Sequence, residues 1–270
     1  MNTKIIRYTL VIAVLFAAAL FSSQAYSQDG EEFEVDGIKV ILRPSVKEVI
    51  NVRLFIEGGT ANYTKDKEGI EALALYIAMN GGTQSMSKVE FNTELEKIGT
   101  TINTNANYDY GDIDMTCLKP YWDKSWSLFA DALLNPAFSK EEFDIAQSQF
   151  VAAAAQADSD PDAFLRNSAM SHVFEGKNYS KIPQGSVSSL ESLTLDNVIQ
   201  YYKDNLVKQK CFLVVVGDVS KEDISNKIRS SLGNIPEGNP ASYEDRIFVT
   251  NPDQEVIDRD IEKSLDLCRV

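Results

Sequence analysis

Residues 68–83, EGIEALALYIAMNGGT, form a stretch in which apolar side chains surround a predicted helix on almost every side. Gly69 precedes the helical pattern, and Gly81 and Gly82 follow it, at the place where glycine most often ends a helix. A helix that is apolar all round lies inside a fold rather than on its surface. The stretch therefore predicts a buried helix over residues 69–80, and the rest of the chain must supply the layers that bury it.

The first 27 residues have the pattern of a secretory signal peptide. Lys4 and Arg7 form a basic start, an apolar run follows, and small residues lie at cleavage spacing before Ser27. The apolar run is shorter than the ~20 residues that a membrane-spanning helix needs. We expect cleavage after Ala25 or Ser27, no stable membrane span in the mature chain, and export to the periplasm or cell envelope of a bacterium.

The composition is that of an ordinary globular protein with an acid excess. The chain has 270 residues, of which 44% are hydrophobic and 24% charged, and its formal net charge is -14. An acidic surface repels phosphate groups, and the sequence contains no run of Lys or Arg. The composition therefore predicts no nucleic-acid partner, and solubility is the simplest explanation of the acid excess.

The single histidine, His172, limits the chemistry of the chain. A zinc site of two or three histidines cannot be built from it. Its place in a helical pattern favours a packed or partly exposed residue over a catalytic base. The three cysteines are an odd number for an exported protein. Cys117 and Cys211 lie in strand-like runs and are predicted to be small buried hydrophobes, whereas Cys268 lies near the end and could be free.

Several acidic side chains are candidate metal ligands. Glu68 and Glu71 lie at the start of the apolar helix, and we expect both to be solvated charges. Asp109, Asp112 and Asp114 lie together in a predicted strand. Strand alternation places Asp112 and Asp114 on one face, a pattern that Ca²⁺ could use, although a solvated strand face is the favoured interpretation.

Strand and helix patterns alternate along the chain in an order that predicts an α+β fold, a layered antiparallel or mixed sheet backed by helices. Neighbouring strands are expected to be joined by hairpins, the first around the turn dipeptide Asp36–Gly37. Ser87 with Glu90 and Ser139 with Glu142 form helix capping boxes. We predict this domain over residues 30–236, with residues 237–270 forming a linker and the truncated start of a second half. Strands are predicted near residues 33–44, 49–57, 101–118 and 211–218, and helices near 69–80, 88–98, 122–135, 139–158, 161–174 and 221–232. Between the last two helices, a short helix is predicted to be capped at Ser188 and a longer one to run from the cap at Thr194 to near Leu206.

The motifs in this order resemble the insulinase/pitrilysin family of zinc peptidases and the related mitochondrial processing peptidase subunits. The resemblance covers residues 33–236, the first half of such a subunit. The matching motifs, in order, are GIKVILRP, EGGTANYTKDKEGIEALALYIAMNGGT, LEKIGTTINTNANYDYGDI, ALLNPAFSKEEFD, SDPDAF, SSLESLTLDNVIQYYKDNL and CFLVVVGDVSKEDISNKI.

In active members of that family, this helix carries the zinc motif H-x-x-E-H. The resemblance aligns these three positions with Ala72, Leu75 and Tyr76, and a fourth ligand, a glutamate, with Ala153 or its neighbour Ala152. None of these side chains binds zinc or activates water. The resemblance therefore implies a catalytically degenerate member with no catalytic residue, no metal ligand and no cofactor. An ordinary core helix would explain the same apolar stripe, and only the motif order favours a lost metal site.

The resemblance also implies how such a domain could act. Inactive subunits of the family pair with active ones, and active members hold extended peptides by adding them to a sheet edge. The candidate edge here is the strand Ile102, Asn103, Thr104, Asn105 and Ala106. We expect a non-catalytic partner or peptide-binding subunit. The alternatives are half of an active zinc metalloendopeptidase whose metal ligands come from a partner chain, and a stand-alone structural domain.

Overall fold

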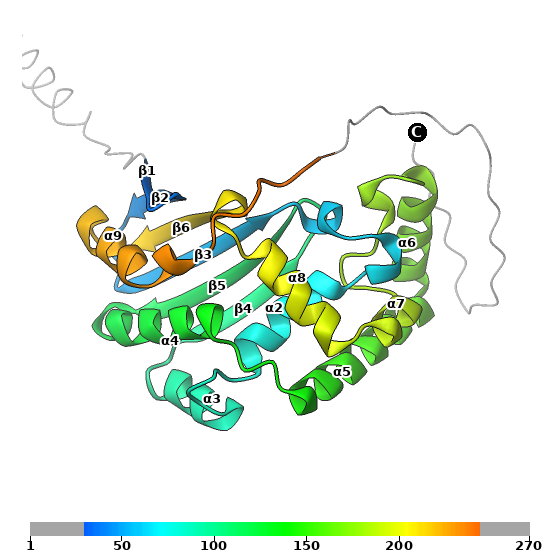
Figure 1. The fold of residues 1–270 in the computed structure, drawn as a ribbon, viewed down its shortest axis with the longest axis horizontal. Helices are drawn as coiled ribbons and strands as arrows, with labels where there is room; N and C mark the ends of the chain where they lie inside the picture. Colours follow the sequence, from blue (N-terminus) through cyan, green and yellow to red (C-terminus); the bar gives the residue numbers. More distant parts are fainter. Residues whose placement is uncertain (1–29, 244–270) are drawn as a thin grey trace, which may run out of the picture. The chain divides into compact units, whose positions relative to one another are not determined.

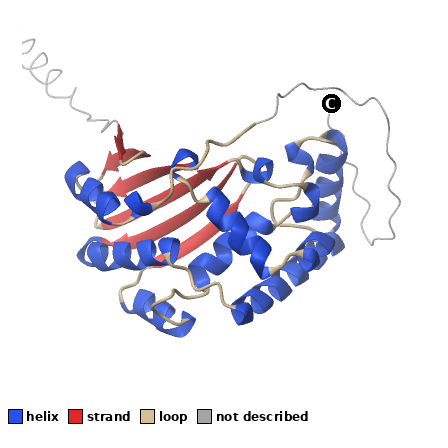
Figure 2. Cartoon of the chain, viewed as in Figure 1, coloured by secondary structure: helices blue, strands red, loops and turns tan. Residues whose placement is uncertain are grey.

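The computed structural model describes residues 30–243. The predicted signal peptide, Cys268 and the predicted second-half segment beyond residue 243 lie outside the described residues. The described part contains one six-stranded mixed sheet with helices packed against it (Figures 1 and 2). The predicted fold class, an α+β layered domain, is confirmed.

The sheet has the spatial order β1-β2-β6-β3-β5-β4. Strand β6 lies between β2 and β3; it is parallel to β2 and antiparallel to β3. The expectation that neighbouring strands are joined by hairpins is therefore wrong for β6, which reaches its place through a long helical connection. The strands are β1 Glu31–Val35, β2 Ile38–Pro44, β3 Val49–Glu57, β4 Thr101–Ala106, β5 Tyr110–Leu118 and β6 Cys211–Gly217.

The first hairpin forms where the sequence predicts it. Asp36 and Gly37 both have positive φ, 50° and 83°, as the two-residue turn with the twist of a hairpin requires. Along β3 the residues then alternate, with Ile50, Val52 and Leu54 buried on the helix-covered face. The other face carries half-exposed side chains. The strand pattern thus decides which face of the sheet the helices cover.

Most of the helices belong to two groups (Figure 1). Helices α2, α4, α8 and α9 lie across one face of the sheet, α5, α6 and α7 lie together at one end of it, and α3 packs beside α4 outside both groups. The helices are α2 Ile70–Asn80, α3 Lys88–Lys97, α4 Trp122–Leu134, α5 Lys140–Ser159, α6 Pro161–Val173, α7 Val187–Ser192, α8 Leu195–Asn205 and α9 Lys221–Ser230.

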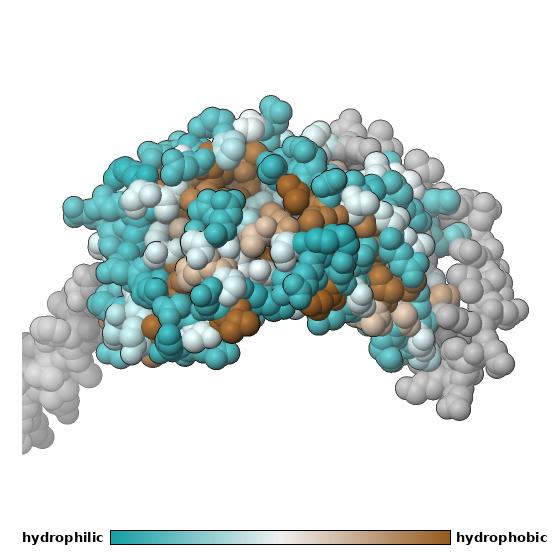
Figure 3. All heavy atoms as spheres, turned by 60° about the horizontal axis from the view of Figure 1, so that its bottom comes forward, coloured by the Kyte–Doolittle hydropathy of each residue, from teal (hydrophilic) through white to brown (hydrophobic). Residues whose placement is uncertain are grey.

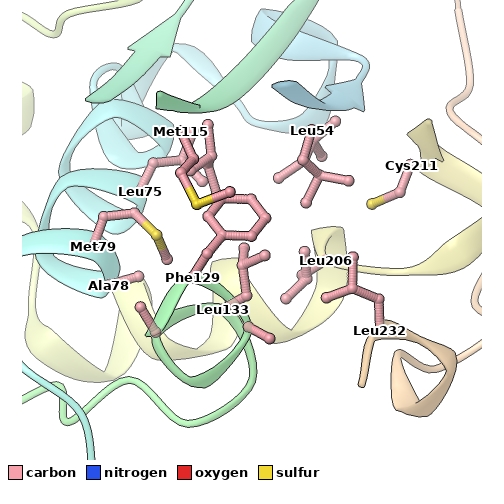
Figure 4. Close-up of a cluster of buried hydrophobic side chains, with 14 of the residues drawn as sticks. Leu54, Leu75, Ala78, Met79, Met115, Phe129, Leu133, Leu206, Cys211 and Leu232 are labelled. Atoms are coloured by element: carbon pink, nitrogen blue, oxygen red, sulfur yellow. The ribbon is translucent and has the colours of Figure 1, made fainter. Parts of the chain in front are cut away.

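Helix α2 is the buried helix that the opening stretch predicts. Figure 4 shows Leu75, Ala78 and Met79 of α2 in one cluster with Met115 of β5 and Phe129 of α4. Its half-buried residues recur every four positions and so share one face. This face consists of Ala72, Tyr76 and Asn80, and its Tyr76 ring contacts Phe150 of α5.

Helix ends and thiols also follow the predictions, except at the start of α5. The Ser87 side chain accepts a hydrogen bond from the Glu90 backbone, with the reciprocal bond that completes a capping box. The Ser139 side chain accepts the Glu142 N–H at the start of α5, but the Glu142 carboxylate binds Lys88 instead of the Ser139 backbone, so this predicted capping box is only half formed. The thiols of Cys117 and Cys211 are free and buried, as expected of small core hydrophobes.

Candidate functional site

A hollow of about 510 Å³ lies where α2, α5, α6 and the segment before α7 meet. Tyr76 of α2 and Ala153 of α5, two of the predicted degenerate positions, both line it. Ala72 lies one turn before Tyr76 on the same half-buried face, and Leu75 is turned into the core with 2% of its surface exposed. The structure therefore brings Tyr76 and Ala153 together from segments far apart in the sequence.

The side chains around this hollow do not fit a metal ion. The Tyr76 hydroxyl lies 3.5 Å from the Gln149 amide oxygen, and its ring packs edge-on against Phe150 with centroids 5.5 Å apart. Zinc in proteins takes imidazole, thiolate or carboxylate ligands. Nowhere in residues 30–243 do three His, Cys, Asp or Glu side chains gather as a metal site would require. His172 lies on α6 and lines a different hollow, together with Lys65 and Glu175.

The predicted peptide-binding strand is the edge strand β4. In its ladder with β5, the Asn107 N–H donates to the Tyr110 carbonyl at 2.9 Å. Hydrogen-bonding direction alternates along an antiparallel strand. The backbone groups of Ile102, Thr104 and Ala106 therefore point toward the open edge.

The remaining residues of β4 face the other way. The backbone groups of Asn103 and Asn105 point toward β5, and the Asn105 side chain donates to Asp112 at 3.1 Å. The Ala106 carbonyl accepts a hydrogen bond from the Gln184 amide at 3.0 Å, and Gln184 also lines the hollow. The open edge of β4 thus ends at the rim of the hollow.

Glu71 is the most deeply buried acid in the described part of the chain, with 1% of its surface exposed. The Tyr201 hydroxyl donates to its Oε1 at 2.9 Å, whereas Oε2 has no hydrogen-bond partner among the described residues. The buried Tyr63 hydroxyl likewise lacks one. Burial raises the pKa of Glu71 to about 8, so the carboxyl is largely protonated at neutral pH. The prediction of a solvated charge is wrong here.

Glu68 is also buried, with 3% exposed, and that prediction is wrong too. Its Oε1 accepts the Ile182 N–H at 3.1 Å, and burial raises its pKa. A Cβ at Gly69, whose φ is 84°, would lie 2.8 Å from the Cα of Gly185. The hydrogen bond from Ile182 to Glu68 and the close contact of Gly69 with Gly185 therefore hold residues 182–185, which line the hollow, against the start of α2.

Asp112 and Asp114 lie on one face of β5, as predicted, but they are paired with a cation of the protein. Arg53 lies 3.5 Å from a carboxylate oxygen of Asp112 and 3.7 Å from one of Asp114. The Asn51 amide donates to Asp114 at 3.3 Å. With 2% and 8% of their surfaces exposed, the two acids are not solvated as predicted, and Arg53 occupies the place that a bound metal cation would take.

Sequence reasoning missed two side chains at the hollow, Arg166 and Gln184. The motif SDPDAF marks the start of α6 at Pro161, so Arg166 on its second turn could have been placed near α5. Nothing local in the sequence places Gln184 against β4, because that contact joins residues 78 positions apart.

A mixed sheet backed by helices, with the central helix α2 meeting the long helix α5 at a hollow, defines a layered α+β domain. The sequence matches the profile of the insulinase family (peptidase family M16) over residues 39–183. The profile of the M16 inactive domain matches residues 192–266. The chain belongs to the insulinase family.

The relatives of this chain include a protein named as a non-peptidase and a peptidase subunit. The non-peptidase homolog YmxG of Helicobacter pylori is 23% identical over 215 residues, which are 79% of this chain and 49% of that protein. The mitochondrial-processing peptidase subunit beta of Dictyostelium discoideum is 18% identical over 216 residues, 80% of this chain and 46% of that protein. The chain spans about half the length of the curated relatives it matches.

Solved structures share the fold. The M16 inactive domain from Pseudomonas fluorescens superposes with a TM-score of 0.73 at 17% identity, covering 79% of this chain and 52% of that one. The first half of the periplasmic protease PqqL from Escherichia coli gives 0.69 at 18% identity, covering 83% and 49%. None of the helices between residues 30 and 243 is long and apolar enough to cross a bilayer.

Proposed function

We propose that this chain is an exported, non-catalytic member of the insulinase family that pairs with a second family subunit and holds extended peptide along β4. The observation that carries the proposal is the chemistry of the four aligned positions. Ala72, Leu75, Tyr76 and Ala153 offer no zinc ligand and no group that activates water. The chain then works without a metal cofactor. The relative named a non-peptidase homolog supports this assignment.

Exposed apolar side chains on α5 and α6 support the pairing. No residue of α6 is fully buried. Ile145 of α5 is 42% exposed and Val173 of α6 is 66% exposed. Figure 3, which brings the bottom of Figure 1 forward, shows apolar patches between the hydrophilic side chains of this side. Pairing with a second subunit on this side would cover Ile145 and Val173.

The first test measures zinc content and peptidase activity of the purified mature chain, alone and mixed with an active family member from the same cell. We expect no stoichiometric zinc, no activity alone, and faster cleavage by the partner in the mixture. Zinc together with activity of the chain alone would overturn the proposal. No effect of mixing would favour a stand-alone structural domain. Fractionation of the source cells tests the proposed periplasmic or envelope location.

A second test asks whether the aligned positions are the ones that lost the metal. The triple variant A72H/Y76H/A153E restores three zinc ligands on the two helices that meet at the hollow. We expect it to bind one zinc ion. The matched control A72H/Y76H/A155E moves the carboxylate two positions along α5, to another helix face, and should not bind. Equal zinc binding by both variants, or by neither, would mean that these are not the ancestral ligand positions.

A further inference from the structure

The hollow beside β4 has the size and walls of a side-chain pocket. Its volume, about 510 Å³, lies in the ordinary range of ligand sites. Ala153, Ala154 and Ala157 of α5 and Ala163 of α6 form much of its lining. These small side chains leave room that larger ones would fill, so the hollow can hold the hydrocarbon part of a ligand side chain.

The hollow is also placed where a bound peptide would reach it. This step depends on the proposed function, a peptide held along β4. The outward groups of Ile102 and Thr104 extend the ladder along β4, and the Gln184 amide already occupies the Ala106 carbonyl. A peptide added to this edge would pair with Ile102 and Thr104, and a residue beyond Ala106 would lie beside Gln184, which lines the hollow.

One cation lines the hollow. Arg166 of α6 is exposed and makes no ion pair with a carboxylate of residues 30–243. The lining also contains one acidic side chain, Asp158 of α5, which takes part in another interaction of the protein. The Arg166 guanidinium presents a planar set of donors that matches a carboxylate.

We propose that this hollow takes a carboxylate-bearing residue of the peptide held on β4. Its carbon stem packs on the alanines, and its carboxylate binds Arg166. An Asp or Glu side chain and a peptide's C-terminal carboxylate supply the same group, so both satisfy the geometry.

The test uses the mature full chain and labelled nine-residue extended peptides in fluorescence anisotropy. One pair carries Glu or Gln at the central position with an amidated end, and another carries a free acid or an amide at the C-terminus. We expect the preferred acid to bind about five- to ten-fold tighter than its neutral twin, a gain that added salt reduces. The pair that shows the preference identifies the source of the carboxylate.

Variants separate the pocket from the edge. R166Q should abolish the preference for the acid, and R166E should favour a Lys peptide over the Glu peptide. R229Q removes the same charge from exposed α9 and should change nothing. T104P removes an outward N–H of the edge strand and should weaken the binding of all peptides. Proline is tolerated at this position because the N–H that it lacks makes no bond within the sheet. T104V keeps that N–H and serves as its control.

The outcomes distinguish the two proposals. If peptides bind and T104P weakens them but R166Q leaves the acid preference unchanged, the carboxylate pocket is wrong and the edge-strand function stands. If acid and neutral peptides bind wild type equally, the pocket is again wrong. If no peptide binds wild type at any concentration tested, both the peptide-holding function and the pocket are overturned.

Discussion

The substitution Glu71→Gln should stabilise the protein by an amount that grows as the pH rises from about 5 to about 8. The wild-type carboxyl is buried beside Tyr201, and its pKa in the folded state is about 8 against an ordinary 4.5. Between these values the unfolded chain releases a proton that the folded chain keeps. The folded state of wild type therefore has its full stability below pH 4.5 and loses it progressively up to pH 8.

The size of the effect follows from the pKa difference. One pKa unit corresponds to about 1.4 kcal/mol. The rise from 4.5 to about 8 therefore destabilises wild type by about 5 kcal/mol above pH 8, and by about 3 kcal/mol at pH 7, relative to low pH. Glutamine keeps the hydrogen bond from Tyr201 and has no proton to lose, so the variant lacks this pH dependence.

Urea unfolding followed by circular dichroism at pH 5, 7 and 8.5 measures the effect. The free energies of unfolding of wild type and Glu71→Gln should lie within about 1 kcal/mol at pH 5 and diverge at the higher pH values. The control Glu141→Gln changes an exposed acid on α5 and should follow wild type. Parallel pH profiles for wild type and Glu71→Gln would refute a raised pKa for this carboxyl.

Three further outcomes test the packing. Phe129→Ala leaves a cavity at a fully buried position and should lower the free energy of unfolding by about 3–5 kcal/mol in urea. Ser87→Ala removes the capping box of α3 and should lower it by about 1 kcal/mol, with Ser87→Thr as the control that keeps a cap. Burial raises the pKa of Cys211 to about 12 and also raises that of Cys117. Peptide mapping after thiol labelling at pH 8 should therefore find both modified only in urea, and labelling of either in the native protein would contradict this.

Local signals were enough to predict most of the fold. The Asp36–Gly37 turn and the Ser87 cap depend on neighbours within four residues, and both are confirmed. The buried helix was predictable because its apolar residues surround the axis. The place of β6 was not, because its parallel pairing with β2 joins Pro44 to Gly217, and no short-range pattern contains that choice.

The buried acids show where sequence reasoning stops. A glutamate at the start of a helix is ordinarily solvated, and Glu71 is buried only because Tyr201, 130 residues away, covers and bonds it. Glu68 is similar, since its partner is the backbone of Ile182. At the candidate site, the resemblance brought Tyr76 and Ala153 to one place, and the hollow contains both. Their ancestral role stays a prediction that the zinc-restoring variants test.

The position of β6 has a consequence for how the chain can be made. Strands β1 and β2 pair with each other, and β3, β5 and β4 pair with one another, but only β6 joins these two groups in the sheet. During synthesis β6 is the last of the six strands to emerge. Until then the backbone groups of β2 and β3 that it will pair with have no strand beside them, and such edges recruit other chains. The strands made first therefore keep uncovered pairing edges until residue 217 has been added.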